Sequence, residues 1–575
     1  MIRQLTVHSS LETLRKEAKR WLRALRAQDP KAHERLRRSH PGAPLQLGLR
    51  DVQYALAREH GAESWAALKA TLTEIAIDNE GHEKLLSEFL EHAPLRYGIR
   101  PGSSGWNRLY YDDPSRWKYA ARILQRHPEI VRGNIHAASV SGDLAEVERI
   151  LKARSAAASE RAALDAQQPL RYLCYSRLPI AATRGNAVAI ATALLDAGSP
   201  CQQPLPDDDR AHFQPLTGAI GAGEAGQPPH PQAEALAALL IDRGADPYDA
   251  QALYNTSLGE DDLLWLDFLY SRSAQRGETH KWAEPSTRWP QCPMVDFLLI
   301  MAVNRNHLRR AQWALSHGAN PRCRHPYYAT RNLHTDALVN RYTQMADLLL
   351  QFGGLADPLE GHPAFQVACV GLDRDAAMRL ADSHPEYLLN PGPLLLAASR
   401  DLKEVAELLL DLGMSPDVSD ATHFRPLHAA ASHDSVAVGA LLIERGAEID
   451  PRETRFNSTP LGWATHGNHR RMMDILGAVS RNVRQLCRIG NVARLRELFT
   501  ENPELAKTTD EHASPLFALP EDEDRAFEIV ELLLANDADP RVVSEDGTTA
   551  AKHAQKQGLD AVADLLTTLT GPRQA

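Results

Sequence analysis

The sequence predicts an all-α solenoid of stacked helix pairs, and three observations predict it. First, a short phrase returns at a fixed spacing, because Pro393, Pro426 and Pro460 are 33 and 34 residues apart. Second, Pro426 opens the run Pro-Leu-His-Ala-Ala-Ala, which leads to a Leu-Leu pair and then to Gly446. Third, aromatic residues make up only 6% of the chain, as thin helical repeats require. A period in this range is typical of repeats that pack on their neighbours.

The composition excludes several other classes of protein. The 575 residues are 43% hydrophobic, which is ample for burial and excludes broad disorder. No run of 18 apolar residues occurs, so no membrane insertion is expected. The first residues, Met1 to Leu5, lack the apolar stretch and cleavage site of a signal peptide. The six cysteines lie far apart without a C-x-x-C pair, which argues against zinc and disulfides and favours the cytoplasm.

The first 77 residues predict a small helical head without repeats. Apolar residues recur every three to four positions from Leu11 to Leu25, which predicts one amphipathic helix that ends before Asp29-Pro30. A second helix is expected near Asp51 and a third after Ser64. This head is also a candidate to cover the open end of the solenoid.

The charge is uneven along the chain. The net charge is −10, yet residues 1–70 hold 14 Lys and Arg against 7 Asp and Glu. A basic head on an acidic body is able to contact nucleic acid or to interact with its own solenoid. The nucleic-acid interpretation is the less favoured one, because basic residues on an amphipathic helix are usually its solvated face.

Residues 78–132 predict an irregular helical connector, with helices around 81–91 and 115–126. Aromatic residues concentrate in this segment: Tyr97, Trp106, Tyr110, Tyr111, Trp117 and Tyr119. The favoured interpretation is a small core that joins the head to the first repeat. The alternative is a partner-binding patch, since exposed aromatic residues often anchor interfaces.

The solenoid is expected from 133 to 570, with about 13 units and with insertions near 221–232 and 271–293. Proline at the first position of a helix loses no hydrogen bond, and small residues let neighbouring helices approach closely. Gly446 supplies the left-handed residue that ends the second helix of its unit.

The repeated phrase resembles the ankyrin repeat family, over about three quarters of the chain. The resemblance implies two antiparallel helices per unit, followed by a short β-finger or loop. It also implies that the motif histidines, His136, His334 and His428, are structural residues that hydrogen-bond across the turn between repeats.

More narrowly, the whole chain resembles bacterial ankyrin repeat proteins that have a helical N-terminal head. The segments that carry this resemblance include Leu49–Gln53, Ala57–Gly61, Tyr172–Arg177 and Gln251–Thr256. The last two phrases are unusual for generic ankyrin units and therefore point to a particular role. No established activity accompanies this resemblance.

A search for catalytic motifs finds no phosphate-binding loop, no G-x-S-x-G and no H-E-x-x-H. His466 with His469 is a weak metal candidate, and Cys323 is a weak nucleophile candidate. We therefore predict no catalytic residue, cofactor or metal, and no small-molecule substrate.

The sequence favours a non-catalytic scaffold or adaptor that binds a protein through the concave face of the solenoid. Tyr, Trp and Arg dominate interface hot spots, and such residues lie in the expected fingers and loops. The candidate partner-binding residues are Trp282, Trp289, Arg322, Tyr327, Tyr328, Arg331, Arg452, Arg455 and Phe456. Two alternatives stay open: a nucleic-acid-associated regulator that uses the basic head, and an enzyme with an unrecognised site.

Overall fold

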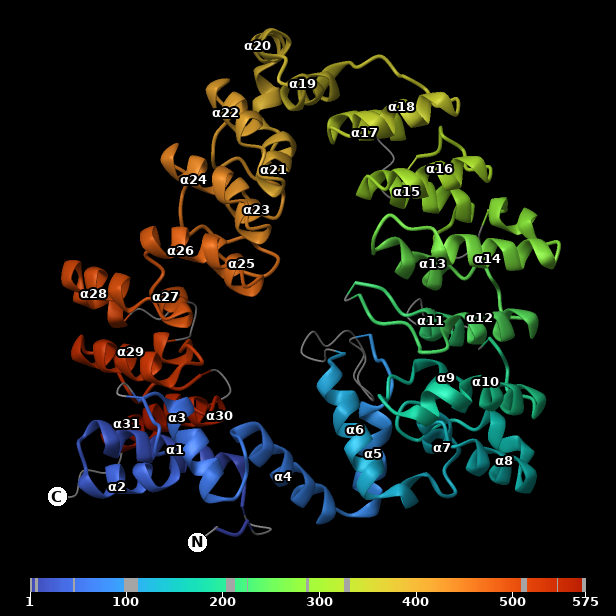
Figure 1. The fold of residues 1–575 in the computed structure, drawn as a ribbon. Coiled ribbons are helices and arrows are strands. Elements are labelled where there is room, and N and C mark those ends of the chain that lie inside the picture. The colour runs from blue at the N-terminus through green and yellow to red at the C-terminus, as the bar shows by residue number, and fades with distance from the viewer. Residues whose placement is uncertain are drawn as a thin grey trace. The chain divides into compact units, whose positions relative to one another are not determined.

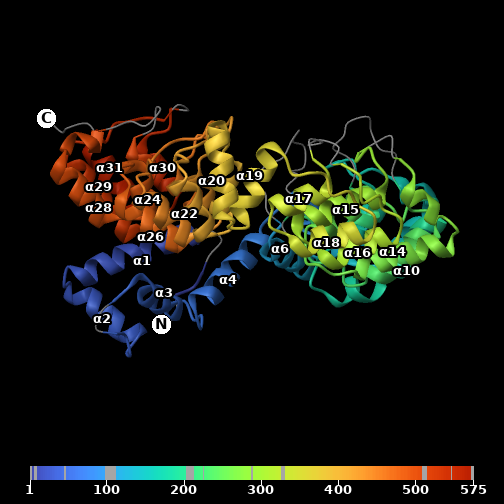
Figure 2. The same cartoon turned by 90° about the horizontal axis from the view of Figure 1, so that it is seen from above.

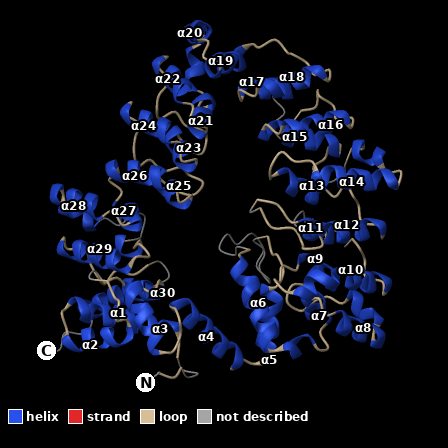
Figure 3. Cartoon of the chain, viewed as in Figure 1, coloured by secondary structure: helices blue, strands red, loops and turns tan. Residues whose placement is uncertain are grey.

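The chain is helical throughout the part that the structure describes. The computed structural model describes residues 3–5, 9–44, 47–97, 112–202, 213–224, 226–285, 289–324, 331–507, 514–544 and 547–570. These residues form α-helices, short 3-10 turns and loops, with isolated β-bridges but no strand (Figure 3). The prediction of an all-α fold is confirmed.

The chain forms two compact units. Unit 1 comprises residues 1–11, 34–337 and 342–357, and unit 2 comprises residues 12–33, 338–341 and 358–575. The N-terminal head is therefore divided, because residues 12–33 belong to the unit that holds the C-terminal repeats.

Unit 1 begins with the helices of the head and connector. These helices are α3 (Leu49–Glu59), α4 (Trp65–Asp78), α5 (His82–His92) and α6 (Pro114–Arg126). The hydroxyl of Ser64 accepts a hydrogen bond from the backbone N–H of Ala67 at 3.1 Å, which fixes the start of α4. The helices expected after Asp51 and Ser64 and around 81–91 and 115–126 are all present, with boundaries that differ by a few residues.

Three of the connector aromatics lie in the described residues, and they pack inward. Tyr97 and Trp117 are 8% and 7% exposed, and the Tyr119 hydroxyl donates to Oε2 of Glu88 at 2.6 Å. The burial of Tyr97 and Trp117 supports the interpretation of a small joining core, and Tyr119 is half-buried. The other three, Trp106, Tyr110 and Tyr111, lie outside the described residues.

The repeats of unit 1 form two layers of helices that follow one another along the chain (Figure 1). The first helices of the pairs are α7 (Ile135–Ser141), α9 (Pro169–Tyr175), α11 (Pro215–Ile220), α13 (Ala250–Ser257), α15 (Met294–Arg305) and α17 (Leu333–Val339). The second helices are α8 (Leu144–Ala153), α10 (Ala181–Asp196), α12 (Ala233–Asp242), α14 (Leu264–Gln275), α16 (Leu308–Ser316) and α18 (Thr343–Gln351). Neighbouring first helices from α7 to α15 are in contact, which is the stacking expected of a solenoid.

Unit 2 has the same two layers. Its first helices are α19 (Gly361–Val370), α21 (Gly392–Ser399), α23 (Pro426–Ser432), α25 (Pro460–His466), α27 (Val483–Ile489) and α30 (Ala550–Lys556), with a 3-10 turn at Pro515–Phe517 in place of one helix. Its second helices are α20 (Arg374–Ser383), α22 (Lys403–Asp411), α24 (Val436–Glu444), α26 (Arg470–Val479), α28 (Val492–Glu501), α29 (Glu523–Ala535) and α31 (Asp560–Thr570). In the view from above, α20, α22, α24, α26 and α28 follow one another (Figure 2). One apolar core runs through these repeats from Phe365 to Leu566.

Two N-terminal helices precede these elements: α1 (Leu11–Arg26) and α2 (Pro30–Ser39). The apolar stripe of α1 is buried, as its spacing predicts, and includes Leu14, Ala18 and Trp21. The indole Nε1 of Trp21 donates to the backbone oxygen of Ala32 at 3.1 Å, which ties α1 to the start of α2.

The regular repeats of unit 2 use the residues of the repeated phrase as expected. The Thr459 hydroxyl accepts from the N–H of Gly462 at 3.1 Å, and Pro460 occupies the first turn of α25. Gly446 follows α24 with φ of +82°, a left-handed conformation that favours glycine and ends the helix.

The motif histidine is a structural residue in these repeats. Nδ1 of His428 accepts from the N–H of Arg425 at 3.1 Å, while Nε2 lies 3.1 Å from the Pro451 oxygen and 3.2 Å from the Ser458 oxygen. The side chain is fully buried. His428 therefore joins its own helix to the loop that leads into the next repeat, and Nε2 of His136 makes the equivalent contact with Glu160 O at 3.0 Å.

Candidate functional site

The backbone of the loop between α24 and α25 is fixed by a buried carboxylate. The carboxylate of Glu453, 1% exposed, accepts from the backbone N–H groups of Arg455 (2.7 Å), Phe456 (3.0 Å) and Ser458 (3.2 Å). The N–H of Thr454 donates to Thr422 O in the preceding loop at 2.8 Å. Because its backbone is fixed, this loop presents its outward side chains in one arrangement.

Three side chains of this loop and two partly buried rings that pack beside it form what we call the finger patch: Arg452, Arg455 and Phe456, with Phe424 and Trp463. Phe456 is 40% exposed and its ring lies 5.5 Å from that of Trp463, which lies 5.6 Å from that of Phe424. The guanidinium of Arg455 lies 5.0 Å from the centre of the Phe456 ring, and Nη1 of Arg452 donates to Asn457 O at 2.7 Å. Aromatic residues and arginines on a rigid support are typical of binding hot spots.

The sequence prediction included Arg452, Arg455 and Phe456 but missed Phe424 and Trp463. Phe424 precedes the repeated phrase by two residues, and Trp463 stands where the preceding repeat has Ala429. An aromatic residue at a position that is small in the preceding repeat is the signal that would have identified Trp463.

The predicted residues of unit 1 are dispersed. Nε of Arg322 donates to Gly353 O at 2.9 Å, and Nε of Arg331 pairs with Oδ1 of Asp336 at 2.8 Å, so each arginine also supports its own repeat. Tyr327 and Tyr328 lie outside the described residues.

Trp282 is a core residue, which corrects the expectation that it lies on an exposed loop. Its side chain is only 1% exposed, with its ring 5.3 Å from that of Tyr270 and 5.9 Å from that of Trp313. A short 3-10 turn at Thr279–Ala283 directs it inward. Trp289, in contrast, is half-buried, with its ring 5.5 Å from that of Tyr254.

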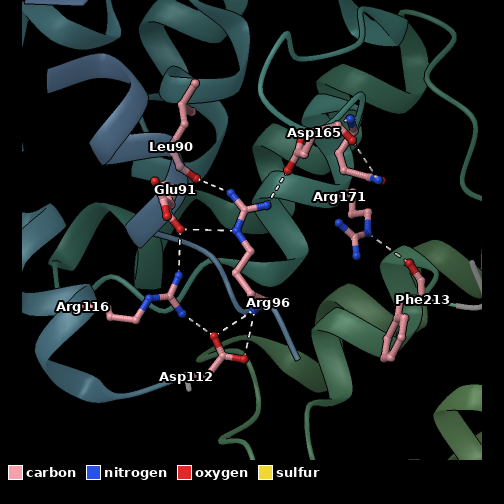
Figure 4. Close-up of polar contacts among 9 residues, drawn as sticks. Leu90, Glu91, Arg96, Asp112, Arg116, Asp165, Arg171 and Phe213 are labelled. Atoms are coloured by element: carbon pink, nitrogen blue, oxygen red, sulfur yellow. Dashed lines mark hydrogen bonds and ion pairs between the residues drawn. The ribbon is translucent and has the colours of Figure 1, made fainter. Parts of the chain in front are cut away.

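A buried ionic cluster joins the connector to the first repeats (Figure 4). Both oxygens of Asp112 accept from the N–H of Arg96, at 2.9 and 3.0 Å, and Asp112 also pairs with the Arg116 guanidinium. The Arg96 guanidinium pairs with Asp165 and donates to Leu90 O at 2.6 Å. Since Asp165 follows the first helix pair, Arg96 holds the connector against that pair.

The two unusual phrases of the sequence converge on the insertion near 221–232. Arg177 donates from Nε to Pro228 O at 2.8 Å and from Nη2 to Gly218 O at 2.6 Å. Nδ2 of Asn255 donates to Gly221 O at 3.3 Å, and the N–H of Gly223 donates back to Asn255 O at 3.2 Å. The base of this insertion, which lies within the third helix pair, is therefore clamped between residues of the second and fourth pairs.

The ionisable groups around this clamp are perturbed by burial. Burial lowers the pKa of Arg177 to about 10, and burial together with Arg177 lowers the pKa of His230 to about 3. Burial also raises the pKa of Asp249, the N-cap of α13, to about 6. Perturbed groups are typical of active sites, but here Arg177 donates to backbone oxygens, so the arrangement locks the fold.

The weak catalytic candidates show no supporting chemistry. Burial raises the pKa of the Cys323 thiol well above its ordinary range, which disfavours the reactive thiolate. Nδ1 of His469 lies 2.8 Å from Ala431 O, a structural contact. In the residues that the structure describes, no group of three or more His, Cys, Asp or Glu is arranged to hold a metal ion.

Comparison with known proteins identifies the repeats. Residues 394–485 match the family model of ankyrin repeats, in three copies. These residues include the finger patch and the regular repeats of unit 2. The chain thus contains ankyrin repeats, within an all-α fold of stacked helix pairs. No curated protein matches the chain.

Ankyrin repeats generally mediate protein–protein interactions, and the family is typically non-catalytic. Among the described residues, no helix combines the length and the apolar character needed to cross a bilayer.

Proposed function

We propose that the protein is a non-catalytic scaffold that binds a protein partner through the loop side of its ankyrin repeats. The observation that carries this proposal is the finger patch, where Arg455 and Phe456 stand on a loop fixed by Glu453. A prearranged loop loses little conformational entropy on binding, so its contacts contribute fully to affinity. The patch lies within residues 394–485, the segment that matches ankyrin repeats.

Arg452 belongs to the same patch, and the other candidate partner-binding residues, Trp289, Arg322, Tyr327, Tyr328 and Arg331, stay predictions from the sequence. We omit Trp282 because it is buried. We also propose a cytoplasmic location, supported by six free cysteines. The bacterial origin that the resemblance implies stays a prediction.

The nucleic-acid alternative is less well supported. Lys19 and Arg26 of the basic head pair with Glu523 and Asp524 of the acidic C-terminal repeats. Residues paired in this way favour the interpretation that the head interacts with its own solenoid. A nucleic-acid regulator predicts binding to duplex DNA or RNA that weakens steeply with salt.

The experiment is affinity capture from native lysate with the tagged full-length chain, followed by measurement of the affinity of the captured partner. Replacing Arg455 and Phe456 together by Ala removes the exposed tip of the patch, and we expect about 30-fold weaker binding. The matched control is Leu264→Ala with Arg272→Ala on α14, where an exposed apolar residue and an arginine near the Phe268 ring lie outside the patch. Equal affinity of both double variants would contradict the proposal.

A further inference from the structure

A groove of about 360 Å³ lies between helix α1 and the last helix pair of unit 2, α30 and α31 (Figure 1). Lys16, Arg20 and Arg23 line this groove from α1, and Lys552 lines it from α30. Spacings of four and three residues place the three cations of α1 on one face of that helix. Four cations from two separate elements therefore face the same groove.

Helix α1 forms a fixed wall of the groove. Its apolar stripe is buried and consists of Leu14, Ala18, Trp21, Leu22 and Leu25. On its polar side, Nζ of Lys19 lies 3.1 Å from Oε1 of Glu523 and 3.9 Å from Oδ2 of Asp560. Because α1 is anchored by apolar burial and by these ion pairs, its row of basic side chains is presented in a defined place.

Three of the four cations are uncompensated. Arg20, Arg23 and Lys552 are exposed, and within the part of the chain that the structure describes their side chains make no ion pair. Lys16 is already paired, since its Nζ lies 2.8 Å from Oε1 of Glu12 and 3.7 Å from an oxygen of Asp560. Like charges around one groove repel each other, so an anionic ligand would relieve an unfavourable interaction there.

Two carboxylates in the groove indicate which kind of anion it suits. Asp560 is neutralised by the lysines of α1, whereas Asp564 is exposed and also lines the groove. A nucleic acid carries a negative charge on every phosphate, and its backbone would meet Asp564. A peptide can place carboxylates beside Arg20 and Arg23 and a neutral residue beside Asp564. The mixed lining therefore favours an acidic peptide over a nucleic acid.

We propose that this groove binds an acidic peptide segment of a partner protein, whose carboxylates pair with Arg20, Arg23 and Lys552. An arginine can hold a carboxylate through two parallel N–H groups, which makes the two arginines the main contacts. The side chains of Gln555 and Thr567 also line the groove and supply polar groups for the peptide backbone. The groove shares no residue with the finger patch, so the two surfaces can be tested separately.

The test is fluorescence anisotropy of the full-length chain with a labelled synthetic peptide of Glu, Asp, Ala and Leu. Arg20→Gln with Arg23→Gln should weaken binding of this peptide at least about tenfold, because both bidentate contacts are lost. The matched control is Arg15→Gln with Arg58→Gln. It removes the same charge from two exposed positions outside the groove and should change the affinity less than about twofold.

A second variant tests the proposal through a gain of affinity. Asp564→Asn removes a carboxylate that repels the ligand, so the peptide should bind about two- to threefold more tightly. Arg455→Ala with Phe456→Ala should leave peptide binding unchanged, because the finger patch is a separate surface.

Three outcomes would overturn the proposal. The first is a wild-type chain that does not bind the peptide, and the second is equal weakening by the two double arginine variants. The third is a DNA duplex that binds more tightly than the peptide and is lost with Arg20 and Arg23, which would assign the groove to nucleic acid.

Discussion

The regular repeats of unit 2 and the irregular repeats of unit 1 are held together in different ways. In unit 2 the residues of the repeated phrase stabilise the repeats. His428 joins its helix to the following loop, and Gly446 ends the second helix of its unit. In unit 1 the helix pairs at 169–257 contain an insertion, and Arg177 with Asn255 clamps its base. The repeat phrase predicts the first arrangement and gives no information on the second.

This difference teaches that a departure from a repeat pattern can be as well ordered as the pattern. The insertion near 221–232 has polar contacts from two separate helix pairs, and its backbone N–H groups are bonded at Ala222, Gly223 and Gln227. A buried backbone group without a partner costs free energy, so each missing repeat contact requires a substitute. In unit 1 the substitutes are the two phrases that ankyrin units ordinarily lack.

The largest expected effect comes from Arg177→Met. The change keeps much of the side-chain volume and leaves the carbonyls of Gly218 and Pro228 without their buried donor. We expect unit 1 to lose about 3–5 kcal/mol of its free energy of unfolding. The denaturant dependence of hydrogen exchange in α9 and α11 measures this loss. Arg243→Met, at an exposed arginine of the same unit, should cost less than about 1 kcal/mol.

Glycine substitutions sharpen the comparison between the units. An added Cβ at Gly218 meets the ring of Tyr175, which is 1% exposed, whereas one at Gly439 meets the flexible end of Met472 at 2.8 Å. A rigid buried ring cannot move aside, so Gly218→Ala should cost about 3 kcal/mol and Gly439→Ala about 1 kcal/mol. Thermal unfolding of both variants tests this order. Equal losses would show that the ring is free to move.

Acid should weaken unit 1 through His230. The pKa of this residue is lowered to about 3, whereas the unfolded chain takes up a proton near its ordinary value of 6.5. The stability from neutral His230 is complete above pH 6.5 and is lost as pH falls, by about 2 kcal/mol between pH 6.5 and 5. His230→Asn retains an acceptor for the N–H of Gln232 and should reduce this acid sensitivity. The exposed His280→Asn should leave it unchanged.

The smallest expected effect concerns a helix start in unit 2. Thr459→Ala removes the hydroxyl that accepts from the N–H of Gly462, which should cost about 1 kcal/mol. Urea titration followed by the exchange rate of α25 measures this change. An unchanged rate would show that Pro460 alone is sufficient to fix the start of the helix.

The sequence predicts the helix pairs and the role of His428 because both leave a periodic signal. It does not predict that Arg96 binds Asp165 or that Lys19 reaches Asp560, because ion pairs between distant segments follow no period. The burial of Trp282 was missed for a related reason. A tryptophan in a long loop has no spacing that distinguishes an inward turn from an exposed one.

At the candidate site, the sequence identifies residues by type and position in a loop, and the structure selects among them. The structure favours Arg455 and Phe456 as binding residues, because Glu453 fixes their backbone and Trp463 packs against the Phe456 ring. None of these contacts is visible from residue types alone. Loop length and composition predict where a surface lies, but not which of its side chains are supported.

The most direct test of the contrast between the units is the hydrogen exchange of the wild-type insertion. The N–H groups of Ala222, Gln227 and His230 donate to backbone oxygens at 2.8, 3.2 and 2.9 Å. If the clamp holds as described, these amides exchange as slowly as those of the loop at 449–459 in unit 2. Exchange at the rate of an unstructured peptide would show that the insertion is a free loop and would contradict this account.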